Sequence, residues 1–173
     1  MNIIHTPHEV LTTPAATVGR IDKKIHTLIS EMKKALVAHK DPEGVGLAAT
    51  QVGVAKRIFI MMPTKQAPIE VFINPEIVEQ SEISHVSKSK ETRLEGCLSI
   101  PRLWGPVRRS EKVRLVWQDE HGMQREEWFS GFKAIIIQHE VDHLNGILFT
   151  QRIMEQHGRL YIEKDGELEE YKI

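Results

Sequence analysis

The chain has 173 residues, of which 40% are hydrophobic and 27% are charged, and its net charge is −1 at pH 7. This near-neutral balance argues against the electrostatic surfaces that bind nucleic acids or membranes. A single cysteine excludes an internal disulfide, and no stretch has the length and apolarity of a membrane span. Because there is also no apolar N-terminal run of the signal-peptide kind, we expect one cytoplasmic domain over residues 1–173.

The N-terminal third combines an arm, a helix and a stretch of small residues. Residues 1–20 show no clear periodicity and should form the arm. Asp22 can cap a helix whose apolar residues recur at helical spacing as far as Leu36, and which should end before the breakers at 41–44. The glycine- and alanine-rich stretch 44–53 lacks the Gly-Lys-Ser/Thr ending of a phosphate loop, and alone it predicts only a tight turn packed against a helix.

Most of the remaining segments show the alternation or the turn residues of antiparallel strands. The first are 57–62 and Ile69 to Ile73, which Asn74-Pro75 should close, followed by an irregular strand and loop over 76–89. Segments 113–117 and 123–129 should form a hairpin with a turn at 119–122. In the C-terminal tail, 151–173, Asp165-Gly166 indicates another hairpin. Short strands around two helices predict an α+β domain with a mostly antiparallel sheet.

The lone cysteine lies in the motif Glu95-Gly96-Cys97-Leu98-Ser99, ahead of Pro101, which should end this strand-like segment. A free cysteine is usually a small buried hydrophobe. Its thiolate is also a strong ligand for zinc or ferrous iron, so Cys97 is a candidate metal ligand.

Residues 130–145 predict a helix that starts at the N-cap Ser130 and carries Gln138-His139-Glu140-Val141-Asp142-His143. His139 and His143 are four residues apart, so both imidazoles lie on one helix face and can bind the same metal ion. Glu140 is rotated by about 100° and borders that face, where this pattern uses it as a general base. The alternative is a solvated, charged helix turn, although the histidines continue an apolar stripe that should face the core.

Three motifs therefore occur in order: 44–51 (GVGLAATQ), 95–99 (EGCLS) and 138–143 (QHEVDH). Together they resemble the peptide deformylase family closely, and the similarity extends over roughly Ile3 to Arg152. The resemblance implies antiparallel sheets wrapped around a central HExxH helix. It also implies hydrolysis of the N-formyl group from the initiator methionine of new polypeptides, with release of formate.

The resemblance also implies roles for individual residues. Cys97, His139 and His143 would hold one divalent metal ion, usually Fe2+ in this family, with Zn2+ or Ni2+ able to substitute. The side chain of Gln51 and the backbone N–H of Leu98 would face the formyl oxygen, and Glu140 would be the general acid/base. Three protein ligands leave a position open for water, as a catalytic site requires.

A formyl-methionine substrate needs an apolar slot and a backbone partner. The candidates for the slot are Val45, Leu98, Phe132, Ile135 and Ile136, for which plain core packing is the alternative. Backbone hydrogen bonding near Gly46 would give sequence-tolerant recognition of an extended peptide. Glu95 and Arg109 match positions that commonly form a supporting ion pair in the family; two unconnected surface charges are the alternative.

Two features depart from the family pattern. Many relatives continue with Pro-Gly-x-Arg-Gly, whereas this chain has Pro101-Arg102-Leu103-Trp104-Gly105, which leaves recognition beyond the methionine open. Some bacterial relatives end in a basic helix that contacts the ribosome, but residues 155–173 are net acidic and do not support that contact.

Three other functions are alternatives to a deformylase. An HExxH metallopeptidase is disfavoured, because the third ligand is an upstream cysteine. A catalytically silent protein that captures peptide N-termini is disfavoured by the complete set of Gln51, Cys97, His139, Glu140 and His143. A hydrolase for another formylated amine is motivated by Arg102 and Trp104.

Overall fold

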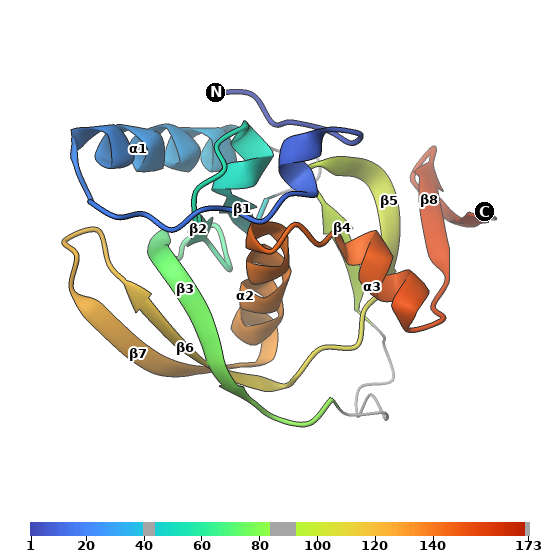
Figure 1. The fold of residues 1–173 in the computed structure, drawn as a ribbon. Helices are drawn as coiled ribbons and strands as arrows, with labels where there is room; N and C mark the ends of the chain where they lie inside the picture. The colour runs from blue at the N-terminus through green and yellow to red at the C-terminus, as the bar shows by residue number, and fades with distance from the viewer. Residues whose placement is uncertain (40–43, 84–92, 172–173) are drawn as a thin grey trace.

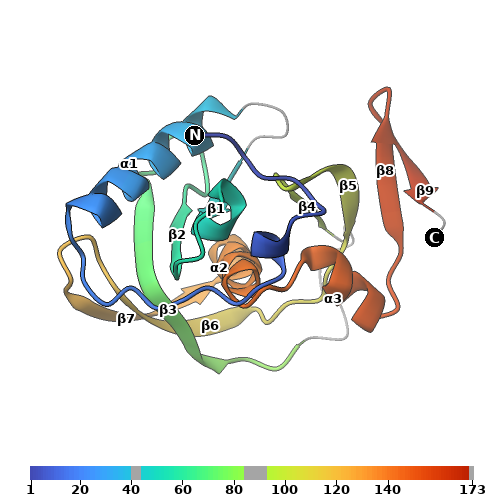
Figure 2. The ribbon, with the colours of Figure 1, turned by 45° about the horizontal axis from the view of Figure 1, so that its top comes forward.

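Helix α2 (Gly131–Leu144) lies at the centre of the fold (Figure 1), and the strands form two antiparallel sheets. The computed structural model describes residues 1–39, 44–83 and 93–171. Viewed nearly along α2, the five-stranded sheet curves around one side of the helix, and strands β4 and β5 lie on the other (Figure 2). This arrangement confirms the predicted α+β fold with antiparallel sheets around the HExxH helix.

The five-stranded sheet has the order β1-β2-β3-β6-β7, and the four-stranded sheet has the order β4-β5-β8-β9. The strands of the first are β1 (Gly46–Ala48), β2 (Ile58–Met61), β3 (Glu70–Gln80), β6 (Lys112–Gln118) and β7 (Gln124–Ser130). Those of the second are β4 (Leu94–Cys97), β5 (Ile100–Pro106), β8 (Leu160–Lys164) and β9 (Glu167–Tyr171). The helical segments besides α2 are η1 (Glu9–Leu11), α1 (Lys23–Ala38), η2 (Ala49–Val52) and α3 (Phe149–Glu155).

Helix α2 is buried on several sides, which explains why its interior carries both apolar and polar residues. Ser130 occupies the N-cap with an extended backbone, although its side chain makes no capping hydrogen bond. Gly146 follows the helix with φ 73°, and a Cβ there would lie 2.8 Å from the backbone of Thr12. Glycine is therefore required at this exit by both backbone conformation and packing.

Helix α1 covers the other face of β1 and β2 through a second apolar cluster that includes Leu28, Met32 and Leu36. The carboxylate of Asp22 accepts hydrogen bonds from the backbone N–H groups of Lys24 (2.9 Å) and Ile25 (3.1 Å), as the predicted N-cap requires. The helix ends at Ala38, and the predicted breakers at 41–43 lie outside the described residues. No helix in the described part of the chain combines the length and apolarity needed to cross a membrane.

Two predicted boundaries are wrong, and one helix was missed. Strand β3 continues through Asn74-Pro75 to Gln80, because a bulge with Asn74 at φ 51° absorbs the irregularity and pairing with β6 resumes at Glu76. Pro101 does not end a strand, since β5 runs from Ile100 to Pro106. Helix α3 was not predicted, and the turn at Asp165 and Gly166 joins β8 to β9 beyond it. Part of the irregular segment expected at 76–89 lies outside the described residues.

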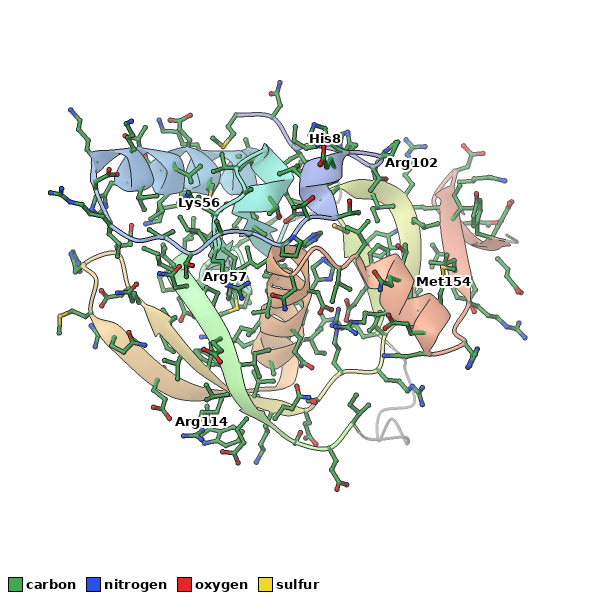
Figure 3. All side chains as sticks on the ribbon, viewed as in Figure 1. His8, Lys56, Arg57, Arg102, Arg114 and Met154 are labelled. Carbon is green, nitrogen blue, oxygen red and sulfur yellow. The ribbon has the colours of Figure 1, made fainter. Side chains whose placement is uncertain are left out.

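Arg57 ties the five-stranded sheet to the end of α2 (Figure 3). Its guanidinium donates to the side-chain oxygen of Asn145 (2.9 Å) and to the backbone oxygens of Pro75 (3.1 Å) and Leu144 (3.4 Å). These bonds satisfy a C-terminal carbonyl of α2 and hold the helix against the bulge in β3.

Candidate active site and metal centre

Cys97, His139 and His143 converge at one point between β4 and α2. Cys97 is the last residue of β4, and the two histidines project from one face of α2. Their ligand atoms all lie within 4.8 Å of one another, and the Sγ of Cys97 is 3.2 Å from the Nε2 of His143. The predicted helix geometry thus brings both imidazoles to the cysteine of a segment more than 40 residues upstream.

Glu95 fixes the orientation of His139, because one of its carboxylate oxygens lies 2.9 Å from the Nδ1 of the ring. Arg109 holds that carboxylate through two hydrogen bonds of 2.9 Å, which confirms the ion pair expected between these positions. Arg109 also contacts Asp142, whose other oxygen accepts a 2.7 Å bond from Arg152. Burial raises the pKa of Glu95, but the hydrogen bonds from Arg109 and His139 outweigh it and lower that pKa to about 2.

The three side chains suit a divalent metal ion. A carboxylate on Nδ1 directs the Nε2 of His139 into the site, which is the arrangement common among metal-bound histidines. Burial lowers the pKa of His143 well below its ordinary value, so its imidazole stays neutral, as a metal ligand must. One thiolate and two imidazoles favour zinc or ferrous iron over calcium or magnesium, and they leave a coordination position open.

Glu140 lies beside these ligands in a buried position with only 4% of its surface exposed. Its Oε2 makes no hydrogen bond within the described structure, and burial raises the pKa of the carboxyl to about 7. Its Oε1 lies close to Gly46 of β1, where a Cβ would approach to 2.4 Å. A carboxyl with a pKa near neutrality can both accept and return a proton.

Gln51 reaches the site from η2, which the stretch of small residues forms together with β1. Its Oε1 accepts a 2.9 Å hydrogen bond from the backbone N–H of Ala48, and this bond fixes the orientation of the amide. The Nε2 consequently points into the site, where it lies 3.4 Å from the Sγ of Cys97 and 3.2 Å from the Oγ of Ser99.

A cavity of about 220 Å³ opens beside these groups. Its lining includes the proposed catalytic residues Gln51, Leu98 and Glu140 and two of the three candidate metal ligands, Cys97 and His139. It also includes the other residues expected to contact the substrate, which are Val45, Gly46, Phe132, Ile135 and Ile136. His143 is 1% exposed and is not part of the wall. Phe132 lines the cavity and also packs against the apolar cluster around α2.

Sequence reasoning missed or left open several residues in the cavity wall or next to the candidate metal ligands. Trp104 lines the cavity, whereas Arg102 on the same strand does not. Arg93 also lines it, with its guanidinium carbon 3.6 Å from the ring centroid of Phe132. Phe149 packs its ring against His139 at 6.1 Å between centroids. Phe149 and Arg93 lie outside all three motifs, so nothing in the sequence connected them with the site.

Comparisons with known proteins agree with this geometry. The family model described as polypeptide deformylase matches residues 1–159. The peptide deformylase of Rhodopirellula baltica is 38% identical over 99% of this chain and 81% of its own. The crystal structure of peptide deformylase from Thermotoga maritima matches with a TM-score of 0.76 and 34% identity, over 87% of this chain and 95% of that one. A Met-Ala-Ser-bound structure from Acinetobacter baumannii gives a TM-score of 0.75 and 35% identity, over 88% of this chain and 98% of that one. The chain belongs to the polypeptide deformylase family.

Proposed function

We propose that this protein, acting in the cytoplasm as one domain over residues 1–173, removes the N-formyl group from the N-terminal methionine of newly synthesised polypeptides. The products are formate and a peptide with a free amino terminus. Family membership supports the reaction. The observation that carries the assignment is the convergence of Cys97, His139 and His143 beside the buried Glu140, at a cavity with an apolar wall.

Cys97, His139 and His143 would hold the metal, and we propose Fe2+ as the native ion, with Zn2+ or Ni2+ able to replace it. The soft thiolate and the two imidazoles suit all three ions. When bound, such a cation supplies Lewis acidity and lowers the pKa of a coordinated water. The remaining steps depend on side chains and backbone groups of this chain.

Gln51 and Leu98 would stabilise negative charge on the formyl oxygen as the carbonyl carbon becomes tetrahedral. The Nε2 of Gln51 is already directed by the bond from Ala48, so little reorganisation is needed. The backbone N–H of Leu98 would be the second donor. Losing one such donor typically costs about 3 kcal/mol of transition-state stabilisation.

Glu140 would accept a proton from the attacking water and deliver it to the departing amine. An amine is a poor leaving group without that proton. In the metal-free chain burial raises the pKa of Glu140 to about 7, so this carboxyl can both take up and release a proton near neutral pH. Burial of the carboxyl keeps its proton affinity high.

Val45, Phe132, Ile135 and Ile136 would enclose the methionine side chain in the cavity. The backbone of Gly46 would pair with the extended peptide, which gives recognition that does not depend on later side chains. The net acidic tail gives no support for ribosome docking, so the peptide is the one partner we assign.

Formate release from formyl-Met-Ala-Ser tests this proposal, with protein prepared anaerobically and loaded with Fe2+ or Ni2+. Unformylated Met-Ala-Ser is the matched control, because a metallopeptidase would cleave it and a deformylase would not. Stoichiometric formate with an intact Met-Ala-Ser product is expected. Cleavage of the Met-Ala bond, or tight binding without formate release, would contradict the proposal.

A further inference from the structure

The N-terminal arm makes two backbone hydrogen bonds to segments that carry active-site residues. The N–H of Ile4 donates to the backbone oxygen of Gln51 (2.8 Å), and the N–H of Thr6 donates to the backbone oxygen of Ser99 (3.1 Å). Figure 1 and Figure 2 show the arm, drawn in dark blue, running from the N-terminus toward β5 before it turns back into η1. The arm therefore joins two segments that lie 48 residues apart in the chain.

The bond to Gln51 satisfies a carbonyl that its own helical turn leaves without a partner. Segment η2 is only four residues long, and the N–H of Gly53 that caps it bonds to the oxygens of Ala49 and Thr50 instead. Gln51 is 1% exposed, so its carbonyl cannot replace the bond from Ile4 by one to bulk water. Ile4 consequently fixes the main chain from which the Gln51 amide, a proposed donor to the formyl oxygen, extends.

The bond to Ser99 holds the turn that carries the second proposed donor. Leu98 and Ser99 form the two-residue turn that joins β4 to β5, directly after Cys97. Ser99 is fully buried, and the bond from Thr6 is made to its backbone oxygen. Its Oγ lies 3.2 Å from the Nε2 of Gln51, the same nitrogen that is to face the formyl oxygen. The bonds from the arm use backbone oxygens alone, so they can stay in place while that amide contacts the substrate.

The arm is itself anchored on both sides of these two bonds. Ile3 packs against the apolar cluster that includes residues of α1, and Leu11 is completely buried. Further along, the N–H of Ala15 donates a 2.8 Å hydrogen bond to the backbone oxygen of Leu144 at the end of α2. An anchored segment can restrain the groups that it bonds to, which a fraying terminus could not do.

We propose that the N-terminal arm is a positioning element for deformylation, in which the N–H groups of Ile4 and Thr6 hold the two donors to the formyl oxygen at a fixed separation. This inference rests on the proposed deformylase function. Two donors stabilise the tetrahedral state together only if both reach the same oxygen, and a displacement of about 1 Å can lower a rate about 100-fold. The donors belong to η2 and to the turn between β4 and β5, and the arm bonds to the main chain of both.

Backbone esters test these bonds without changing a side chain. An α-hydroxy acid with the isoleucine side chain at position 4 replaces the donating N–H by an oxygen atom. The same exchange at His5 is the matched control, because the His5 N–H makes no hydrogen bond within the described structure. With formyl-Met-Ala-Ser as substrate, the ester at position 4 should lower kcat about tenfold and leave KM, bound Ni2+ and the affinity for Met-Ala-Ser within about twofold. The ester at position 5 should leave all four within about twofold of the parent values.

A double-mutant cycle distinguishes positioning of Gln51 from a general loosening of the fold. Gln51→Ala removes the donor that Ile4 positions, so in that background the ester at position 4 should lower kcat less than about threefold. A loss that stays tenfold in this background, or a loss of bound Ni2+ from the ester protein, would overturn the proposal in favour of a purely structural arm.

A genetically encoded pair addresses the same bond. Ile4→Pro lacks the N–H and Ile4→Ala retains it, so only the proline variant should show the lower kcat at unchanged KM. Equal kcat in this pair, together with a position-4 ester as active as the parent protein, would overturn the proposal while leaving the reaction intact. A parent protein that releases no formate from formyl-Met-Ala-Ser would instead refute the proposed function.

Discussion

Replacing Glu140 by glutamine is expected to stabilise the metal-free protein above neutral pH while abolishing turnover. Burial raises the pKa of Glu140 to about 7 from its ordinary value of 4.5. The folded chain therefore binds this proton more tightly than the unfolded chain, so stability falls as pH rises through this range. The difference between the two pKa values corresponds to about 3 kcal/mol at pH 8, and to almost nothing at pH 4.5. Glutamine has no charge to bury, so Glu140→Gln escapes this loss.

Urea unfolding of both proteins, kept reduced and metal-free, measures the difference at pH 4.5, 6 and 8. The stability gain of Glu140→Gln should grow from near zero to about 3 kcal/mol across the series. Repeating the measurement with bound metal adds a second check, because a neighbouring cation favours the carboxylate and should shrink the gain. A gain that does not depend on pH, or a variant less stable than the parent at pH 8, would refute the burial argument.

The other predictions concern the groups that hold the site together. Arg109→Gln should lower the free energy of unfolding by about 3–5 kcal/mol at pH 7 in urea titrations, because it leaves buried carboxylates without their partner; a loss below about 1 kcal/mol would contradict this. Glu95→Gln should weaken Co2+ binding about 10–100-fold by releasing His139, as followed by cobalt absorption, and equal affinity would refute the orienting role. The pKa of Glu95 is lowered to about 2, so the ionised carboxylate stabilises the folded protein above pH 4.5 and this stabilisation is lost as pH falls toward 2. The difference in free energy of unfolding between the parent protein and Glu95→Gln should therefore become smaller between pH 4.5 and pH 2. Gly46→Ala should reduce kcat about 100-fold without unfolding the protein, because its Cβ displaces Glu140, and an unchanged kcat would show that the carboxyl tolerates movement.

Local sequence patterns predicted α2 and the shared face of its two histidines because the relevant distances are set within one helix. His139 and His143 are four residues apart, so they lie on the same face of the helix. Gly146 ends α2 because its positive φ is a backbone conformation that few other residues adopt. The third candidate ligand, Cys97, came from the resemblance of its motif to the family pattern, because a lone cysteine is usually a small buried hydrophobe. What the helix pattern alone left open was whether the cysteine reaches the histidines, and the 3.2 Å separation of Sγ and Nε2 answers this.

Features that depend on contacts between distant segments were not predictable in the same way. Asn74-Pro75 resembles a strand end, yet β3 continues because the side chain of Asn74 bonds to the backbone of Val18, 56 residues away. Trp104 was only an open alternative until its indole was seen between Gly96 and Glu163.

The most direct test of the account follows formate release from formyl-Met-Ala-Ser while Ni2+ is added to the metal-free enzyme under anaerobic conditions. The rate should rise in proportion to bound Ni2+ and reach its plateau at one ion per chain. Glu140→Gln should bind the same single ion and release no formate. Formate release that does not depend on the ion, or Glu140→Gln turnover equal to that of the parent protein, would contradict the central claim that Cys97, His139, His143 and Glu140 form one deformylating centre.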